Sequence, residues 1–475
     1  MSAQDFDLVI RGGRVVDPVH GLDDIADIGI TGTAIADVAP TIESTGATRT
    51  IKADGQVVLP GIVDSHVHLP SVFSPSGRPD SHRRLAVAGV TTAVEFARFS
   101  QVVEEWHEAS AGLTLLGLEA MPAYERTPSR EQIAADIDAA ERSGAVGVKL
   151  LGGHFPSTPE ASALTIEQCA ERGLYAAFHA GTTHHGSDLD GMQEALALAD
   201  GHPMHLAHTN AYLRGATDEL ETENRRALDL LLEHPRVVSE SHLAPLNVAF
   251  GALNDGQLTD HIAHNCLRLR GLDPTPDGLR EAFETGYVFV HAPEVDEPVT
   301  GSHGFQLWRE LRDPLLSFEV NRRLTAFHQA CARVSSAGSL TYEGPGSFVV
   351  DAISSDGGGW RNLILDQGVL LVQFGALSWL QFAAKTSLRP AQMFGLHSKG
   401  HFTPGADADI VVVDPLHRTA SVTIAAGRVI AENRRSVATG GRVITTERGR
   451  GAVAEKGIPY RTIDLHDSVY LTKGR

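Results

Sequence analysis

The middle of the chain alternates short apolar runs with longer amphipathic stretches, the pattern that parallel strands joined by helices produce. The apolar runs, which we expect to form buried strands, are VVLPGIVDSH, VTTAVEF, LTLLGLEA, AVGVKLL, GLYAAFH, PMHLAH, RVVSESH and SFVVDAI. The stretch SREQIAADIDAAERSG, between the third and fourth runs, begins with a Ser-x-x-Gln pattern that caps helices. Eight strands with helical crossovers predict an α/β chain with a (β/α)₈ TIM barrel at residues 58–400.

The two ends of the chain consist of short strand-like segments separated by turn residues. DLVIRGGRVVDP and ADIGITGTAIADVAP lie before the barrel, and ADADIVVVDP, ASVTIAAGRVI and GGRVITT lie after it. We expect residues 1–57 and 401–475 to pair as one small β-sandwich domain beside the barrel, ending in a C-terminal tail.

One connection inside the barrel is much longer than the others. Residues 245–346 separate RVVSESH from SFVVDAI, far more than a normal crossover needs. They include a helical segment, NRRLTAFHQACARVS, and a candidate extra strand, GYVFVHAP. Two interpretations stay open with equal weight: a lid or substrate-selecting subdomain over the catalytic face, or a contact between the subunits of a homo-oligomer.

Composition and charge narrow the class of partner. Hydrophobic residues make up 42% and charged residues 21% of the chain, a normal globular balance. The net charge of −19, from 59 acidic and 40 basic residues, argues against binding to nucleic acid. The three cysteines lack CxxC spacing, and the chain shows no signal peptide and no apolar run long enough to span a membrane. We therefore expect a cytoplasmic protein that acts on a small molecule, with no nucleic acid or membrane partner.

Side chains that can bind metals recur where the predicted strands end, at the face where barrels carry their active sites. In chain order they are His66, His68, Lys149, His179, His205, His208 and Asp356. Each has an ordinary explanation when taken alone, such as polar packing, a surface lysine or a turn aspartate. Their ordered recurrence instead favours one or two divalent metal ions with open coordination positions.

Four motifs together resemble the amidohydrolase superfamily over nearly the whole chain: PGIVDSHVH, GVKLLGG, SSDGGG and FTPGADADIVVVDP. The chain is similar to hydantoinase- and dihydroorotase-like members and also to D-aminoacylase-like members. The resemblance implies an enzyme that hydrolyses a carbon–nitrogen bond other than a peptide bond.

The resemblance also implies a site with two divalent metal ions, which we expect to be Zn²⁺. The implied ligands are His66, His68 and Asp356 for one ion, His179 and a strand-six histidine for the other, and Lys149 between them. Carboxylation of Lys149 by CO₂ would turn a buried cation into an anionic oxygen ligand. Similar family segments place the ligand at the second histidine of HxxH, which favours His208 over His205, although the sequence leaves both open.

The implied reaction begins with attack of a metal-bound hydroxide on the substrate carbonyl. Asp356 would take the proton of the hydroxide and deliver it to the leaving nitrogen. His154 stands five residues after Lys149, where hydantoinase-like relatives carry a tyrosine that hydrogen-bonds the developing oxyanion. We expect His154 either to replace that tyrosine or to be an ordinary loop histidine.

Two substrate classes fit the motifs. The motif SSDGGG, together with the histidines of strand six, favours an N-acyl amino acid as the substrate, and the D enantiomer is the first candidate. Lys149 instead resembles the bridging lysine of the hydantoinase type, whereas D-aminoacylase-like members often have a cysteine as the bridge. Ring opening of a cyclic amide is therefore the alternative reaction. A third alternative is a non-catalytic protein that uses the barrel as a scaffold. Relatives of that kind have lost metal ligands, whereas this chain retains them.

The substrate-binding candidates lie in loops after the strands. Arg214 could bind a substrate carboxylate, with Tyr212 beside it, and His242 could form part of the pocket wall. His184 and His185 follow strand five, where solvent-exposed loop positions are the favoured interpretation.

Overall fold

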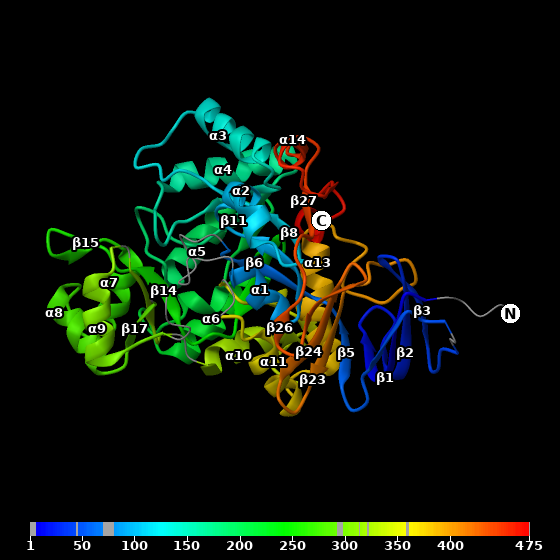
Figure 1. The fold of residues 1–475 in the computed structure, drawn as a ribbon. Helices are drawn as coiled ribbons and strands as arrows, with labels where there is room; N and C mark the ends of the chain where they lie inside the picture. The colour runs from blue at the N-terminus through cyan, green and yellow to red at the C-terminus, as the bar shows by residue number, and fades with distance from the viewer. Residues whose placement is uncertain are drawn as a thin grey trace.

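The structure is a computed structural model that describes residues 6–43, 46–69, 80–291, 298–312, 314–320, 323–357 and 361–474. Figure 1 shows a central ring of strands between a sheet on the right, which joins the two ends of the chain, and a small lobe on the left. We call these parts the strand ring, the end sheet and the insertion lobe. In the described part of the chain, none of the helices combines the length and apolar character needed to cross a membrane.

The strand ring consists of parallel strands in chain order. They are β6 (Ile62–Val67), β7 (Val90–Glu95), β8 (Thr114–Gly117), β9 (Glu119–Ala120), β10 (Gly147–Leu150), β11 (Tyr175–Phe178), β12 (Met204–Leu206), β13 (Val237–His242) and β22 (Ala352–Ser354). Hydrogen bonds join β6 to β7 and β8, and join β9 through β13 to β22. The Asp356 N–H donates to the His66 carbonyl at 3.0 Å where β22 lies beside β6. This is the arrangement expected of a (β/α)₈ barrel, and each predicted run supplies a strand.

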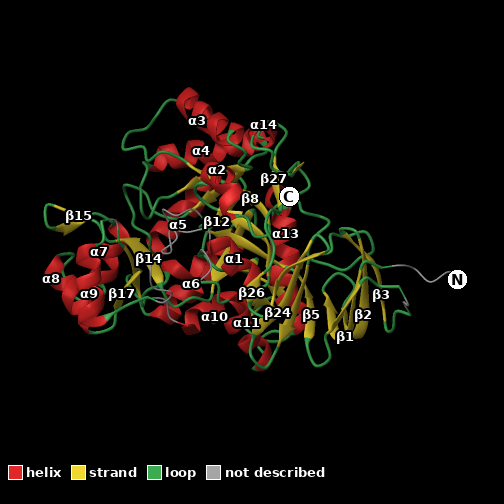
Figure 2. Ribbon diagram, in the orientation of Figure 1, coloured by secondary structure: helices red, strands yellow, loops and turns green. Residues whose placement is uncertain are grey.

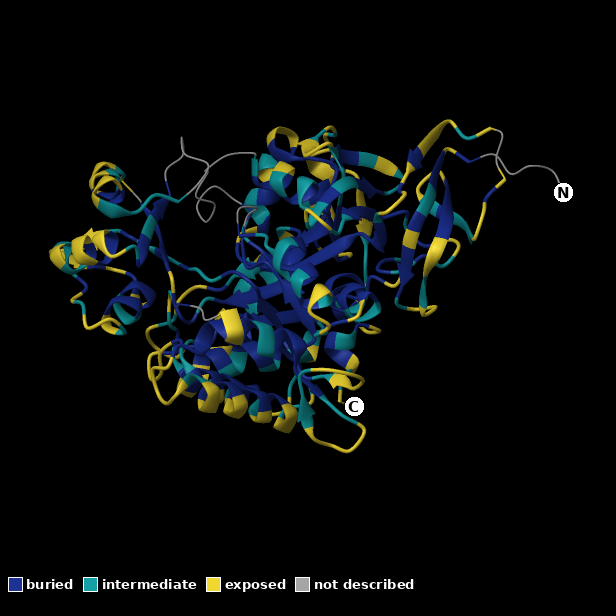
Figure 3. Cartoon of the chain, turned by 90° about the horizontal axis from the view of Figure 1, so that it is seen from below, coloured by how far each residue is buried: buried dark blue, intermediate teal, exposed yellow. Residues whose placement is uncertain are grey.

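Helices cover the outside of the strand ring, as Figure 2 shows. They are α1 (Asp80–Val87), α2 (Phe99–Ala109), α3 (Arg130–Arg142), α4 (Pro159–Arg172), α5 (Leu189–Ala199), α6 (Leu220–Glu233), α10 (Arg323–Cys331), α11 (Ile364–Gln373), α12 (Trp379–Ala383) and α13 (Arg389–Met393). The predicted cap of α3 forms, because Ser129 Oγ accepts from the Gln132 N–H at 3.2 Å. Figure 3 shows the strands buried and the exposed residues on the outer faces of the helices. The burial pattern follows the amphipathic sequence pattern.

The end sheet joins the first and last parts of the chain. Its strands are β1 (Leu8–Asp17), β2 (Leu22–Thr31), β3 (Ala34–Ala39), β4 (Arg49–Lys52), β5 (Val57–Pro60), β23 (Ile410–Asp414), β24 (Thr419–Ala425), β25 (Arg428–Glu432) and β26 (Arg435–Ser436). β5 lies between β1 and β23 and leads directly into β6. Hydrogen bonds connect all of these strands in one continuous sheet.

The C-terminal tail departs from the expected pairing. GGRVITT, grouped with the end strands from its sequence pattern, forms β27 (Arg442–Thr445), which pairs with β8 of the strand ring instead. Val443 and Ile444 are buried there, and that burial explains the different partner. The tail continues through α14 (Arg450–Glu455), β28 (Tyr460–Thr462), which pairs with β27, and α15 (Val469–Thr472).

The insertion lobe (247–320) has its own sheet and core. It contains β14 (Asn247–Phe250), β15 (Leu253–Asn254), β16 (Gln257–Leu258), β17 (Val288–His291), β18 (Leu315–Phe318), α7 (His261–Arg268), α8 (Pro276–Glu284) and α9 (Gly301–Glu310). Within the expected strand GYVFVHAP, Val288–His291 forms β17. The described part of NRRLTAFHQACARVS contains α10, which packs on α6 and β13 and so belongs to the strand ring, outside the lobe. Three short strands follow α10: β19 (Arg333–Val334), β20 (Leu340–Thr341) and β21 (Ser347–Phe348).

Candidate metal centre

One cavity opens where the strands of the ring end. The structure brings all six favoured metal ligands to its wall: His66, His68, Lys149, His179, His208 and Asp356. The cavity lining also includes apolar residues: Leu151, Val248, Phe250, Ile262 and Leu315. Four of these apolar residues belong to three elements of the insertion lobe: β14, α7 and β18. The cavity therefore has a polar floor made by the strand ring and an apolar wall made largely by the lobe.

The first histidine pair comes from β6 and the residue after it. His66 and His68 are two residues apart, so both rings lie on the cavity side, and their Nε2 atoms are 3.3 Å apart. Asp356 Oδ1 lies 3.3 Å from His66 Nε2 and 3.5 Å from His68 Nε2. Burial would lower the pKa of His68, but the carboxylates of Asp356 and Glu95 outweigh it and raise that pKa to about 9. A divalent cation between these groups would take the place of the proton that His68 otherwise holds.

The second histidine pair comes from β11 and β12. His208 Nε2 lies 3.1 Å from His179 Nδ1, and the other ring nitrogen of His179 is 2.9 Å from Ser187 Oγ. Burial holds the pKa of both rings well below the usual range, with neighbouring positive groups adding to the effect. Both rings are therefore neutral, which is the form that binds metals.

Lys149 lies on β10 with 1% of its surface exposed. Its Nζ has no hydrogen-bond partner among the described residues and lies 4.7 Å from the centre of the Phe96 ring. Burial lowers the pKa of Lys149 to about 7, although the charges of Glu240 and Asp356 oppose the shift. A buried amine without a partner is costly, so this position is suited to a chemical or coordination partner.

The donor spacing fits divalent metal ions. Tetrahedral zinc with bonds of 2.0–2.1 Å holds its ligand atoms about 3.4 Å apart. The two histidine pairs have separations of 3.3 and 3.1 Å. Ligand atoms of His66, His208 and Asp356 also lie within 4.8 Å of one another, which places the two pairs in one cluster. Nitrogen and carboxylate donors in this arrangement are typical of zinc sites.

Two ligand candidates hold a strained backbone. Asp356 has φ +50° and His208 has φ +33°, both in the left-handed region that non-glycine residues seldom occupy. The first histidine of the HxxH segment, His205, lies elsewhere: it is fully buried outside the cavity lining, with Nδ1 2.9 Å from the Tyr175 hydroxyl. The geometry therefore brings His208, and not His205, to the cavity wall.

Two charged residues that the sequence analysis missed support the site. Glu240, fully buried on β13, accepts hydrogen bonds from His66 Nδ1 and from the His208 N–H, both at 2.7 Å. Arg361 Nη1 lies 3.1 Å from Asp356 Oδ2. Burial would raise the pKa of Asp356, but Arg361, followed by nearby histidines, holds it well below the usual range. The sequence feature that could have revealed Glu240 is its position two residues before His242, because alternate residues of a strand lie on the same side.

His154 reaches the cavity because two glycines precede it. The backbone of Gly152 and Gly153 passes so close to Gly181 and the His179 ring that a Cβ at either position would collide with them. The His154 ring centre is 5.1 Å from that of His179, and its Nδ1 lies 3.0 Å from Asp260 Oδ2. The loop therefore holds His154 beside the predicted metal ligands.

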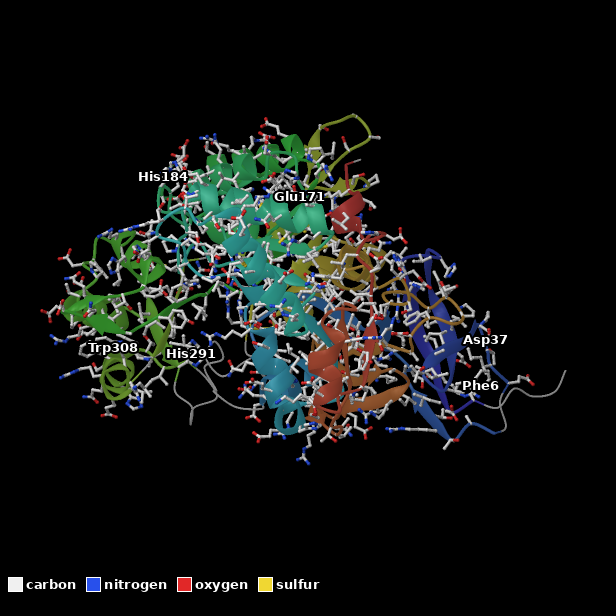
Figure 4. All side chains as sticks on the ribbon, turned by 90° about the horizontal axis from the view of Figure 1, so that it is seen from above. Phe6, Asp37, Glu171, His184, His291 and Trp308 are labelled. Carbon is white, nitrogen blue, oxygen red and sulfur yellow. The ribbon has the colours of Figure 1, made fainter. Side chains whose placement is uncertain are left out.

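The substrate-binding candidates divide between the cavity and the core. Arg214 lines the cavity, and its Nε donates to the Ala211 carbonyl at 2.7 Å. Tyr212 is fully buried behind the wall, where its hydroxyl accepts from the Ala180 N–H at 2.9 Å, so its contact is structural. His242 is also fully buried, with Nε2 3.9 Å from Asp356 Oδ2, and lies behind that carboxylate instead of in the wall. His184, labelled in Figure 4, points to solvent with 64% of its side chain exposed.

Several known proteins are similar to this chain over nearly its whole length. The family model described as "Amidohydrolase family" matches residues 343–444. An allantoinase of Rubrobacter xylanophilus is 27% identical over 95% of this chain and 98% of its own length. A D-hydantoinase of Streptomyces coelicolor is 26% identical over 93% of this chain and 94% of its own. A solved D-aminoacylase, described with a binuclear metal centre, shares the fold with a TM-score of 0.62 and 18% identity, over 91% of this chain and 98% of its own. The chain is therefore similar to enzymes of the amidohydrolase family over nearly its whole length.

Proposed function

We propose that the enzyme hydrolyses the amide bond of a small N-acyl amino acid, with D-amino acid derivatives as the first candidates. The observation that carries this proposal is the cavity itself, whose lining combines an arginine and apolar side chains with the cluster of candidate metal ligands. The fold shared with D-aminoacylase supports the choice of substrate to test first.

The cluster would hold two divalent ions, and zinc suits its donors best. His66, His68 and Asp356 would bind one ion and His179 and His208 the other, with Lys149 between them. When bound, the ions would polarise the substrate carbonyl and make water more acidic. The Lys149 amine has a pKa of about 7. In its neutral form its nitrogen can bond to the carbon of CO₂ and lose one proton, which gives an anionic carbamate.

Asp356 would move the proton that hydrolysis requires. Arg361 holds Asp356 Oδ2 at 3.1 Å and keeps the carboxylate ionised, so it can accept a proton from the attacking water. The same carboxylate would then give that proton to the leaving nitrogen. Arg361 also donates from Nη2 to the Leu246 carbonyl at 2.7 Å, which fixes the guanidinium during this transfer.

Arg214 favours a substrate that carries a carboxylate. It is 9% exposed, and no carboxylate of the described residues pairs with its guanidinium. A buried arginine gains most from a bidentate carboxylate partner. Asn247 supplies a further polar group to the wall, while Leu315 and Phe250 would contact the acyl group or side chain.

Ring opening of a cyclic amide is the second candidate function. The observation that favours it is the similarity to an allantoinase and a D-hydantoinase over nearly the full chain. Lys149 on β10 is compatible with either class. The two functions differ in whether hydrolysis releases a free amine.

A hydrolysis screen with metal-loaded enzyme tests both functions. The panel contains N-acetyl and N-formyl amino acids of both hands, matching N-acetyl amines without the carboxylate, hydantoins and dihydrouracil. We expect amine release from the carboxylated linear substrates, weak turnover of their carboxylate-free analogues, and about two metal ions per chain by elemental analysis. Acid production without amine would show the ring-opening function instead.

The variant Lys149→Ala is the matched test of the metal centre. We expect it to lose metal and to reduce kcat/KM on the order of 10²-fold or more, because the buried ligand between the two histidine pairs is gone. An unchanged metal content and unchanged activity would contradict the proposed site.

A further inference from the structure

The insertion lobe touches the candidate active site through one buried carboxylate. Asp260 stands at the N-terminus of α7 with 4% of its surface exposed. Its Oδ2 lies 3.0 Å from His154 Nδ1, although the two residues are 106 positions apart in the chain. The lobe and the β10 loop therefore meet at the cavity through this contact.

The same carboxylate organises two apolar residues of the cavity wall. Asp260 Oδ2 accepts from the Phe250 N–H at 2.7 Å, and Oδ1 accepts from the Ile262 N–H at 2.7 Å. Both side chains line the cavity together with His154. The rings of Phe250 and His154 meet edge to face at 6.0 Å. One side chain thus orders three neighbouring pieces of the substrate cavity.

These contacts determine which nitrogen of His154 carries its proton. Asp260 already accepts two backbone N–H groups, and an ionised carboxylate has no proton to donate. His154 Nδ1 must therefore be the donor in the bond to Asp260. In the neutral ring, the remaining nitrogen Nε2 then presents a lone pair and accepts hydrogen bonds. This differs from the donor role expected from the family tyrosine.

We infer that Asp260 is a positioning residue that fixes His154 so that His154 Nε2 accepts a hydrogen bond from the substrate's amide N–H. The inference rests on the proposed amide hydrolysis and deepens it. It makes the insertion lobe a functional part of the site, and it names a secondary amide with a free N–H as the substrate feature that is recognised. His154 touches the substrate, whereas Asp260 acts through His154.

A double-mutant cycle with Asp260→Asn and His154→Gln tests the inference. Asparagine keeps nearly the same size, but its single amide oxygen cannot accept from His154 Nδ1, the Phe250 N–H and the Ile262 N–H together, so the contact that fixes the tautomer is weakened. We expect each single variant to reduce kcat/KM about tenfold, mainly through KM, because the contact is already made when substrate binds. The double variant should show the same tenfold loss, since both changes remove one interaction. Losses that multiply to about a hundredfold would overturn the inference.

Thr275→Ala is the matched control for damage to the lobe. Thr275 caps α8 in the same lobe, as Asp260 caps α7, but it makes no contact with His154. We expect this variant to lower the melting temperature about as much as Asp260→Asn while kcat/KM stays unchanged. A tenfold loss of kcat/KM in Thr275→Ala would show that general loosening of the lobe explains the effect, and would overturn the positioning role.

The tautomer can be read without any substrate. In enzyme labelled with ¹⁵N-histidine, the signals missing from His154→Gln identify His154. We expect a protonated Nδ1 and an unprotonated Nε2, and a shift of both signals in Asp260→Asn. An Nε2-protonated ring in the unmodified enzyme would overturn the inference. If the unmodified enzyme hydrolysed no amide of the panel, the proposed function would fail, and the tautomer would still decide whether Asp260 positions His154.

Discussion

At the scale of single residues, the histidines depend on buried carboxylates as much as on their own positions. Glu240 accepts from His66 Nδ1 at 2.7 Å, so the lone pair of His66 Nε2 faces the cavity. Burial would raise the pKa of Glu240, but His66 and His205 keep it well below the usual range. The carboxylate also holds the His208 N–H at 2.7 Å, where the backbone is strained. Glu240 therefore orients one ligand candidate from each histidine pair.

We expect Glu240→Gln to weaken metal binding about 10- to 100-fold, because the amide cannot hold His66 and the His208 N–H as strongly. Competition with a chelator, followed by elemental analysis, measures the change. Glu223→Gln is the control, since Glu223 is an equally buried carboxylate that accepts from the Gly215 N–H at 2.8 Å outside the cavity. Equal metal affinity in the two variants would contradict this role for Glu240.

At the scale of elements, the sheet of the insertion lobe contains a buried histidine that makes it sensitive to acid. His291 on β17 is 6% exposed, and its Nε2 lies 2.6 Å from Ser317 Oγ on the neighbouring β18. Figure 4 labels His291 on the insertion lobe. Burial, reinforced by the charge of Arg361, lowers the pKa of His291 to about 3. The folded lobe therefore holds this ring neutral.

The unfolded chain binds a proton at His291 below its ordinary pKa near 6.5, while the folded chain does not until the pH approaches 3. The contribution of His291 to the free energy of unfolding is therefore fully present above pH 6.5 and is lost as the pH drops. At pH 5 this contribution is smaller by about 2 kcal/mol. We expect His291→Gln to remove about that part of the difference between pH 7 and pH 5 in urea unfolding. His184→Gln, at an exposed ring, should leave the difference as it is. An unaltered pH dependence in His291→Gln would refute the assignment.

At the scale of the whole molecule, the C-terminal tail closes the end of the strand ring opposite the cavity. Tyr470 is fully buried, and its hydroxyl donates to the Pro203 carbonyl at 3.0 Å and accepts from the Ala176 N–H at 2.9 Å. Its ring stacks on Tyr175 with centroids 4.0 Å apart. Lys473 Nζ adds an ion pair to Asp351 Oδ2 at 2.6 Å. These contacts lie at the amino ends of the strands, away from the catalytic chemistry.

We expect Tyr470→Ala to lower the free energy of unfolding by about 3–5 kcal/mol, because it leaves a large cavity and two unpaired backbone groups. Tyr470→Phe keeps the ring and should cost about 1–3 kcal/mol. Denaturant unfolding measures both. Well below the melting temperature, kcat/KM and metal content should match those of the unmodified enzyme, and a loss of either would show that the tail supports the site directly.

The sequence by itself determined those parts of the protein that follow a local period. His66 and His68 share a side because strand residues alternate, and Lys149, His179 and Asp356 reach one cavity because parallel strands end at one edge. The apolar runs that became β6 to β22 were visible for the same reason. Each of these inferences needs a few neighbouring residues.

The tertiary structure alone decided the contacts between segments far apart in the chain. Asp260 meets His154 across 106 positions, and Glu240 meets His66 across 174. Tyr212 follows β12 as Arg214 does, and His242 ends β13, but both side chains pack into the core. GGRVITT paired with β8 because burial of its apolar residues was available there. Strand-end position predicts which residues can face the cavity, whereas long-range packing selects which of them do.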